Sequence, residues 1–321
     1  MSRVFWKALA AIGLAVVAGA CRSELDRSVE RTTRTSVRKL TPPAGALALP
    51  LADGSVRFAV IGDVGRGDQA QRETARQMIA WRERFAFEFV VMLGDNIYPP
   101  HTPEDYRRKF EDPYRPLLDA GVTFHAAIGN HDDPSEVNYA PFNMGGKRYY
   151  TFRKSERRLA GLSGSGVRFF VLDSRTLDNA QLTWLKRELA ASSTTWKICY
   201  LHHPLYTSGR YRSAAYAVRL ALEPLLVAGD VDVVFAGHEH FYERIHPQHG
   251  ISYFISGGGG ALRKHDIRPS ALTAAGYDED CHFMLIEVSG DALYFQTIAR
   301  DGTTIDAGVI ARTPEPAPSG S

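Results

Sequence analysis

Five short apolar segments of this 321-residue chain each end in a polar turn, and this repeated pattern limits the folds that the chain can adopt. A short apolar run bounded by turn residues is typical of a buried β-strand. The five runs cover residues 56–61, 87–93, 122–128, 196–201 and 231–236. Helices are expected at about 69–84, 180–191 and 214–227, and at 103–120 with a break near Pro113. Strands that alternate with helices in this way predict an α/β fold.

Further strand-like segments cluster toward the C-terminal part of the chain. They cover residues 148–152, 167–173, 251–255, 282–288, 292–299 and 304–311. Together with the first five, they predict two packed sheets that are covered by helices. The sequence is 44% hydrophobic, which supplies enough apolar residues for such a core. We expect one domain that extends from about residue 55 to residue 312.

The polar turns place candidate metal ligands after all five of these strands. One carboxylate, amide or imidazole follows each of the first four, and two imidazoles follow the fifth. These residues are Asp63, Asp95, Asn130, His202, His238 and His240. In open α/β sheets, ligands bind beyond the carboxyl ends of the strands. Because the set mixes oxygen and nitrogen donors, it fits a pair of transition-metal ions better than calcium.

The same turns carry a resemblance to a known family. The segments Gly62-Asp-x-Gly65, Gly94-Asp-Asn-x-Tyr98, Gly129-Asn-His-Asp132, His202-x-Pro204 and Gly237-His-x-His240 resemble the five blocks of the calcineurin-like metallophosphoesterases. Tyr98, the run 202–209 and His240-x-Tyr-Glu-Arg244 narrow the resemblance to the purple acid phosphatases. The resemblance covers about residues 56–260. It implies a four-layer α/β/β/α sandwich of two mixed sheets.

The resemblance also implies a dinuclear metal centre. The ligands of Fe(III) would be Asp63, Asp95, Tyr98 and His240. The ligands of a divalent ion, Fe(II), Zn(II) or Mn(II), would be Asn130, His202, His238 and the shared Asp95. Phenolate and carboxylate are hard anions that favour the trivalent ion, whereas the neutral amide suits its less charged neighbour.

The activity implied by the resemblance is hydrolysis of phosphate monoesters by a metal-activated hydroxide. His131 would donate a proton or a hydrogen bond to a phosphoryl oxygen or to the leaving group, and Asp132 would orient a neighbouring ligand. His203, Tyr206 and Arg210 are candidates for the substrate pocket, although a surface loop explains Tyr206 and Arg210 equally well.

Each assignment has an alternative. Asp63 is also compatible with a helix N-cap, and Tyr98 with simple packing. His203 could replace His202 as a ligand, but the family pattern favours the histidine two residues before Pro204. Glu243 and Arg244 are expected to form a structural ion pair.

Two other functions compete with the monoesterase. A phosphodiesterase that acts on cyclic nucleotides or lipid headgroup diesters would use the same motif residues, so only the shape of the pocket would separate the two. An envelope-anchored metal-binding lipoprotein without catalysis would lack a ligand or His131, and the sequence retains all of them.

The first 21 residues have the features of an export signal. Arg3 and Lys7 precede an apolar run at 8–18, which is shorter than the ~20 residues needed to span a bilayer. Gly19-Ala-Cys21 resembles a bacterial lipobox, so residues 1–20 would be a lipoprotein signal and Cys21 would be acylated. A cleaved signal with an incidental cysteine is the alternative. We expect an exported protein that is lipid-anchored to the bacterial cell envelope and faces the periplasm or the exterior.

The segments that flank the expected domain are polar or rich in proline. Residues 21–54 are expected to be a flexible tether, and residues 313–321 a disordered tail. The net charge of +2 gives no indication of nucleic-acid binding, and no obligate protein partner is evident. A disulfide between Cys199 and Cys281 is permitted in an oxidising compartment, but the sequence leaves it open.

Overall fold

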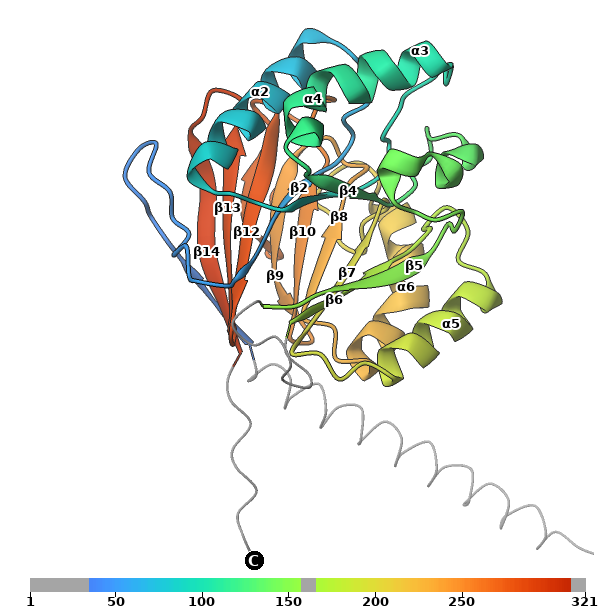
Figure 1. Cartoon of the computed structure of the whole chain (residues 1–321). Helices are drawn as coiled ribbons and strands as arrows, with labels where there is room; N and C mark the ends of the chain where they lie inside the picture. Colours follow the sequence, from blue (N-terminus) through green and yellow to red (C-terminus); the bar gives the residue numbers. More distant parts are fainter. Residues whose placement is uncertain (1–34, 157–165, 313–321) are drawn as a thin grey trace, which may run out of the picture.

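The computed structural model describes residues 35–156 and 166–312. The expected signal segment, Cys21 and the C-terminal tail lie outside these residues, as does most of the Gly/Ser-rich segment near residue 161. Two seven-stranded sheets pack face to face and form the centre of the molecule (Figure 1).

The first sheet has the strand order β1-β14-β13-β12-β2-β3-β4. These strands are β1 (Thr35–Lys39), β14 (Thr304–Arg312), β13 (Ala292–Ala299), β12 (His282–Ser289), β2 (Val56–Ile61), β3 (Phe89–Met92) and β4 (Thr123–Ala126). Strands β2, β3 and β4 are parallel, and the remaining pairs are antiparallel. The sheet is therefore mixed.

The second sheet has the strand order β11-β9-β10-β8-β7-β6-β5. These strands are β11 (Thr273–Tyr277), β9 (Tyr242–Gln248), β10 (Ile251–Ser256), β8 (Val233–Ala236), β7 (Trp196–Leu201), β6 (Val167–Val171) and β5 (Tyr150–Lys154). Its four central strands are parallel, whereas β9, β11 and β5 run antiparallel to their neighbours. This sheet is also mixed.

Helices form the two outer layers. The first sheet is covered by α2 (Gln69–Arg84), α3 (Pro103–Tyr106), a π-helical turn η1 (Arg107–Glu111) and α4 (Asp112–Asp119) (Figure 1). The second sheet is covered by α5 (Asn179–Ala190) and α6 (Arg212–Ala228). Two 3-10 turns, η2 (Pro134–Asn138) and η3 (Ala140–Phe142), follow β4. The four layers confirm the predicted α/β/β/α sandwich.

The expected break near Pro113 is wrong, because the chain stays helical from Pro103 to Asp119. Proline normally leaves the carbonyl four residues earlier without its hydrogen bond. Here that carbonyl belongs to Lys109, and it accepts a hydrogen bond from the side-chain amide of Gln71 on α2. A long-range contact thus replaces the missing backbone bond.

Aromatic side chains fill the space between the sheets. Phe58 of the first sheet stacks on Phe89 with ring centroids 5.1 Å apart. Its edge also meets Phe169 and Phe235 of the second sheet at 5.3 and 6.5 Å. All four rings are fully or almost fully buried. Because β2, β3 and β4 of one sheet and β7 and β8 of the other are held in one core, the loops after these strands lie close together.

The predicted tether at 21–54 is wrong from residue 35 onward. Residues 35–39 form the edge strand β1, which pairs with β14. Farther along, Leu49 is buried, and the amide groups of Leu51 and Ala52 donate to the buried carboxylate of Glu287 at 2.9 and 2.6 Å. Backbone hydrogen bonds hold this segment together with only a few apolar side chains, Val37, Leu47 and Leu49, so its composition gave little signal.

The structure also bears on the two cysteines and on possible membrane-spanning helices. Cys199 and Cys281 are both free and buried, which settles the open question of a disulfide. Within residues 35–156 and 166–312, no helix is long and apolar enough to span a bilayer.

Candidate metal centre

Loops from both sheets bring the predicted ligands together at one edge of the sandwich. Asp63 follows β2, Asp95 follows β3 and Asn130 follows β4, all from the first sheet. His202 follows β7, and His238 and His240 follow β8, from the second sheet. The centre therefore lies at the junction of the two sheets.

Unusual backbone conformations turn these side chains back toward the sheet edge. Asp63, Asp95 and His238 have φ angles of 56°, 52° and 67°. A residue with a Cβ atom in this region costs on the order of 1–2 kcal/mol, and such strain gathers at functional sites. Gly129 is required here, because any Cβ at that position would clash with the carboxylate of Asp95.

The first group of ligand atoms comes from Asp63, Tyr98 and His240. His240 Nε2 lies 3.3 Å from Asp63 Oδ1 and 3.2 Å from Tyr98 Oη. Tyr98 Oη lies 3.5 Å from the same Asp63 oxygen. These three side chains thus present a carboxylate, a phenol and an imidazole to one point.

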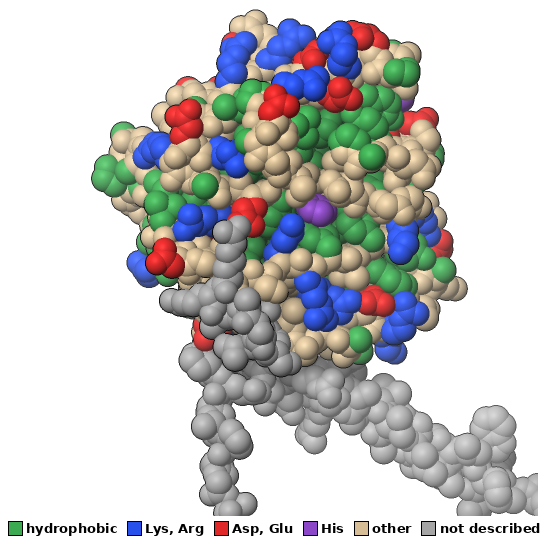
Figure 2. All heavy atoms as spheres, viewed as in Figure 1, with side chains coloured by type: hydrophobic (Ala, Val, Ile, Leu, Met, Phe, Trp, Pro, Cys, Tyr) green, Lys and Arg blue, Asp and Glu red, His purple; other side chains and the backbone are tan. Residues whose placement is uncertain are grey.

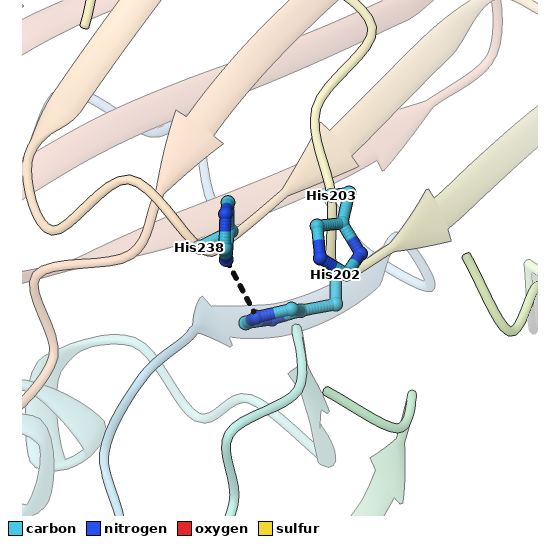
Figure 3. Close-up of side chains that lie close together, drawn as sticks. All are labelled: His202, His203 and His238. Carbon is cyan, nitrogen blue, oxygen red and sulfur yellow. Dashed lines mark hydrogen bonds between the residues drawn. The ribbon is translucent and has the colours of Figure 1, made fainter. Parts of the chain in front are cut away.

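The second group surrounds His202. Its Nε2 lies 3.0 Å from Asn130 Oδ1 and 3.2 Å from His238 Nδ1, and Figure 3 shows the two imidazoles facing each other. The opposite nitrogen, Nδ1, donates to the carbonyl of Leu93 at 2.9 Å. This hydrogen bond fixes the tautomer and leaves the Nε2 lone pair available to a metal ion.

Asp95 connects the two groups. Its Oδ1 lies 3.4 Å from His202 Nε2, and its carboxylate also lies within 4.8 Å of the ligand atoms of Asp63 and His240. The position between the groups is the one that a bridging ligand of two cations occupies.

The charge distribution of the centre favours bound cations. Burial, and then the neighbouring charge of Asp95, raise the pKa of Asp63 well above its usual value. Burial also lowers the pKa of His202 strongly, that of His238 to about 2 and that of His240 to about 4, so these imidazoles are neutral. Neutral imidazole is the form that binds metals, and like-charged buried carboxylates are relieved by a cation. The residues present therefore fit a metal pair.

Tyr98 needs such a cation in order to ionise. Burial, followed by the charges of Asp63 and Asp95, raises the pKa of Tyr98. A phenolate at this position is consequently stable only next to a positive ion.

Asp132 holds the loops that carry the ligands. Its carboxylate accepts hydrogen bonds from the backbone amides of Gly129, Asn96 and Ile97 at 2.7, 2.6 and 3.0 Å. Burial and the charge of Asp95 raise its pKa to about 7. Its contacts fix the loop of Asp95 relative to that of Asn130, as an orienting residue would do.

His131 lies at the mouth of the centre, outside the groups of ligand atoms. Its amide donates to Asp95 Oδ1 at 2.9 Å, and its exposed ring lies 4.8 Å from the ring of Tyr98. His101 Nε2 donates to the carbonyl of His131 at 2.9 Å. These bonds fix the backbone of His131 beside the centre, and its exposed side chain is accessible to a substrate.

The three candidate pocket residues separate in the structure. His203 lies at the centre, where its ring is 4.3 Å from that of His238 and its Nδ1 is 2.9 Å from Ser174 Oγ (Figure 3). Arg210 is exposed to solvent and pairs with Asp266 at 2.9 Å. Tyr206 is in the core against Tyr253, and its hydroxyl donates to Glu223 at 2.6 Å. The pocket assignment of Tyr206 is therefore wrong, because its polar end is already satisfied away from the centre.

The expected ion pair of Glu243 and Arg244 is also wrong. Both residues are on β9, where neighbouring side chains point to opposite faces. Arg244 pairs with Asp306 at 2.7 Å, whereas Glu243 accepts from the amide of Ser208 at 2.9 Å.

Sequence reasoning missed three residues around His238. The ring of Tyr211 lies 4.4 Å from the His238 imidazole. Arg263 donates to the carbonyl of His238 at 2.9 Å and to the carboxylate of Glu239 at 3.3 Å. Buried Glu239 in turn accepts from the amide of Tyr211 at 3.0 Å. Of these three residues, only Glu239 lies within one of the sequence motifs, the Gly237–His240 turn, so only Glu239 could have been predicted from the sequence.

Comparisons with known proteins agree with this arrangement. The sequence model of the family described as calcineurin-like phosphoesterase matches residues 56–242, which is more than half of the chain. Tartrate-resistant acid phosphatase type 5 of Rattus norvegicus is 24% identical over 307 residues, and the match covers 82% of this chain and 92% of that protein.

Solved structures show the same fold. GAP50, described as the anchor in the inner membrane complex of Plasmodium, matches with a TM-score of 0.71 and 19% identity, over 81% of this chain and 90% of that chain. Purple acid phosphatase PPD1 from yellow lupin seeds matches with a TM-score of 0.63 and 17% identity, over 87% of this chain and 59% of that chain. At these identities, the two structures bear on the fold alone.

Proposed function

Because this chain belongs to the calcineurin-like phosphoesterase family, we propose that it hydrolyses phosphate monoesters with two bound metal ions. The family and the acid phosphatase relatives make the chain a metallophosphoesterase, a hydrolase of phosphoesters. The observation that supports the two-metal form is the position of Asp95 between two groups of ligand atoms.

The chemistry of the donors suggests which ion each group would hold. Asp63, Tyr98 and His240, together with Asp95, would hold Fe(III), because anionic oxygen ligands favour a hard trivalent ion. Asn130, His202 and His238, with the same Asp95, would hold Fe(II), Zn(II) or Mn(II). His203 is the alternative ligand, since a ring nitrogen of His203 also lies within 4.8 Å of those of His202 and His238. We assign His202, because its Nε2 contacts both Asn130 and Asp95.

The bound ions would supply an activated water for attack on phosphorus and would stabilise the negative charge that develops on the phosphoryl oxygens. The protein contributes orientation and proton transfer. Asp132 holds two ligand loops in register, and the carbonyl of Leu93 orients His202. His131 is placed at the mouth to donate to a phosphoryl oxygen or to the leaving group.

The preference for monoesters rests on similarity to acid phosphatases. The alternative of a phosphodiesterase uses the same ligands, and no observation of the pocket favours it. The alternative of a non-catalytic metal-binding protein is disfavoured, because every predicted ligand that lies in the described residues converges on one centre.

The decisive experiment is replacement of the shared ligand. We expect Asp95→Ala to lose bound metal and to lose hydrolysis of an aryl phosphate monoester together, because one carboxylate serves both ions. Metal content would be measured by elemental analysis, and rates would be measured on mono- and diester substrates. Asp119→Ala, an exposed substitution at the end of α4, is the matched control.

Two outcomes would contradict parts of the proposal. Activity that persists in Asp95→Ala would remove the two-metal assignment. If the wild-type protein hydrolysed diesters faster than monoesters, the phosphodiesterase would replace the monoesterase as the proposed function.

A further inference from the structure

Helix α6 has an apolar face on its solvent side. Its inner face packs Ala215, Val218, Leu222 and Leu226 against the second sheet. A surface helix of this kind normally carries charged and polar residues on the opposite face. In α6, the outward positions are instead mainly apolar, and they include Ala214, Tyr216, Ala217, Leu220 and Pro224. Tyr216 is 52% exposed and Leu220 60% exposed, which leaves both large side chains largely in water.

The charged residues on the outward face of α6 are all basic. Glu223 is turned toward the core, where it accepts from the hydroxyls of Tyr206 and Tyr253 at 2.6 and 3.2 Å. Arg219 lies over the ring of Tyr216 at 5.0 Å, and Arg212 is exposed at the first turn. The sequence from 210 to 222 contains no acidic residue. The outward face is therefore apolar, aromatic and basic.

The other two long helices differ from α6. The outer side of α2 exposes Arg72, Arg76 and Glu83, and that of α5 exposes Lys186 and Arg187. Figure 2 shows basic and acidic side chains mixed over the helices at the top of the view, the layer of α2, α3 and α4. The apolar face is thus a property of α6 and not of the helical layers in general.

From this face we infer a docking surface for an anionic phospholipid bilayer, formed by Tyr211, Tyr216 and Leu220 with Arg212 and Arg219. Tyrosine rings favour the boundary between headgroups and acyl chains, and leucine favours the acyl side. Arginines next to them attract anionic headgroups. Each group of the surface therefore has a partner in such a bilayer.

Charge also argues against a second copy of the chain as the occupant. Two copies of this face would bring basic groups opposite basic groups, which is unfavourable for association. An anionic bilayer has the complementary sign. Between the two possible occupants of an exposed apolar helix, the bilayer is the one that this surface fits.

The docking surface is continuous with the metal centre. Tyr211 directly precedes α6, and its ring packs on the imidazole of His238 at 4.4 Å. Docking through this surface would hold the mouth of the centre next to the headgroups. The inference does not depend on the proposed hydrolysis, because docking is measured as binding.

The test is vesicle flotation of the full chain in a Cys21→Ser background, which removes the expected acylation site. Vesicles of phosphatidylcholine would be compared with vesicles that also contain phosphatidylglycerol. We expect binding to the anionic vesicles that weakens at high salt, since screening reduces the attraction of the arginines. Tyr216→Ser with Leu220→Ser should weaken partitioning about tenfold, which corresponds to about 1.4 kcal/mol.

The matched control is Leu51→Ser. Leu51 is 41% exposed, and the segment that carries it is bound to Glu287 of the first sheet, so its loss should leave partitioning unchanged. Tyr216, Leu220 and Leu51 are all solvent-exposed, and thermal unfolding would check that each variant is folded.

A second measurement separates α6 from the N-terminal residues as the binding element. A polarity-sensitive fluorophore on Ala217→Cys should shift to the blue with anionic vesicles, whereas the same label on Arg187→Cys of α5 should not. The other two cysteines are buried and should not react. The inference would be overturned if the wild-type protein did not bind the vesicles, or if it bound them without a fluorescence shift at residue 217. It would also be overturned if the protein formed a dimer that Leu220→Ser dissociates.

Discussion

Tyr98 is the residue through which the proposed trivalent ion can be identified. Its hydroxyl lies 3.2 Å from His240 Nε2 and 3.5 Å from Asp63 Oδ1, so it belongs to the ligand group of the proposed trivalent ion. A phenolate bound to Fe(III) gives a visible charge-transfer band, whereas Zn(II) and Mn(II) give none. The colour of the protein therefore reports on this residue.

We predict that Tyr98→Phe abolishes the visible band of the iron-loaded protein, because the ring remains but the phenolate is lost. The measurement is an absorption spectrum recorded together with iron analysis. Tyr211→Phe is the control, since this tyrosine contacts His238 without being a proposed ligand. A band of unchanged position and intensity in Tyr98→Phe would exclude the iron–tyrosine assignment and leave the phosphoesterase assignment intact.

Single residues were predictable from sequence where a turn fixed their place, and not where a distant partner did. Asp63 and Asp95 follow strands whose apolar pattern is strong, so their position at the sheet edge could be foreseen. Tyr206 is only four residues after His202, but Glu223 of α6 draws its hydroxyl into the core. Arg263 contacts His238 although it lies 25 residues later in the sequence. No hydrophobic periodicity predicts such a contact.

At the scale of elements, strands with an apolar run were predictable and strands without one were not, whether they lie at an edge, as β1 and β11 do, or inside a sheet, as β9 does. The strands β2, β3, β7 and β8 have a buried residue at nearly every position, so each reads as an apolar run. The edge strands β1, with the sequence TSVRK, and β11, with TAAGY, contain few apolar residues. Such strands are held through backbone groups, which leave no mark on the composition.

Residues 51–55, which precede β2, are bound to a buried carboxylate. Glu287 accepts from the amides of Leu51 and Ala52 and from the hydroxyl of Ser55 at 2.9, 2.6 and 2.7 Å. We expect Glu287→Gln to lower the free energy of unfolding by about 1–3 kcal/mol, since the amide nitrogen of glutamine cannot accept these bonds.

Urea unfolding would measure this loss, and limited proteolysis should show new cleavage within residues 46–55. Glu83→Gln on the exposed side of α2 is the control. Catalytic rates should stay unchanged, because Glu287 lies on the strand β12 and contacts none of the ligand residues. Unfolding and cleavage equal to wild type would show that the carboxylate is not what holds this segment.

At the scale of the whole molecule, we propose that the chain is attached to a membrane. The sequence around Cys21 supports our proposal of a lipid anchor in a bacterial cell envelope. We predict that the wild-type chain remains with salt-washed membranes after cell fractionation, whereas Cys21→Ser appears in the soluble fraction. The salt wash is needed because it removes any electrostatic docking through α6.

Cys281→Ala is the control for this experiment. It also removes a cysteine thiol, but Cys281 is buried and cannot be acylated in the folded protein. This variant should stay with the membranes. Cys21→Ser that also stays there after the salt wash would rule out acylation at this cysteine as the means of attachment.

The junction at which the metal centre lies has a mechanical consequence. Asp63, Asp95 and Asn130 extend from one sheet, and His202, His238 and His240 extend from the other. Ions bound between them would act as cross-links that resist sliding of one sheet over the other. Binding to the native state alone would also deepen its free-energy minimum by mass action. The rigidity of the sandwich would then rise and fall with the amount of bound metal.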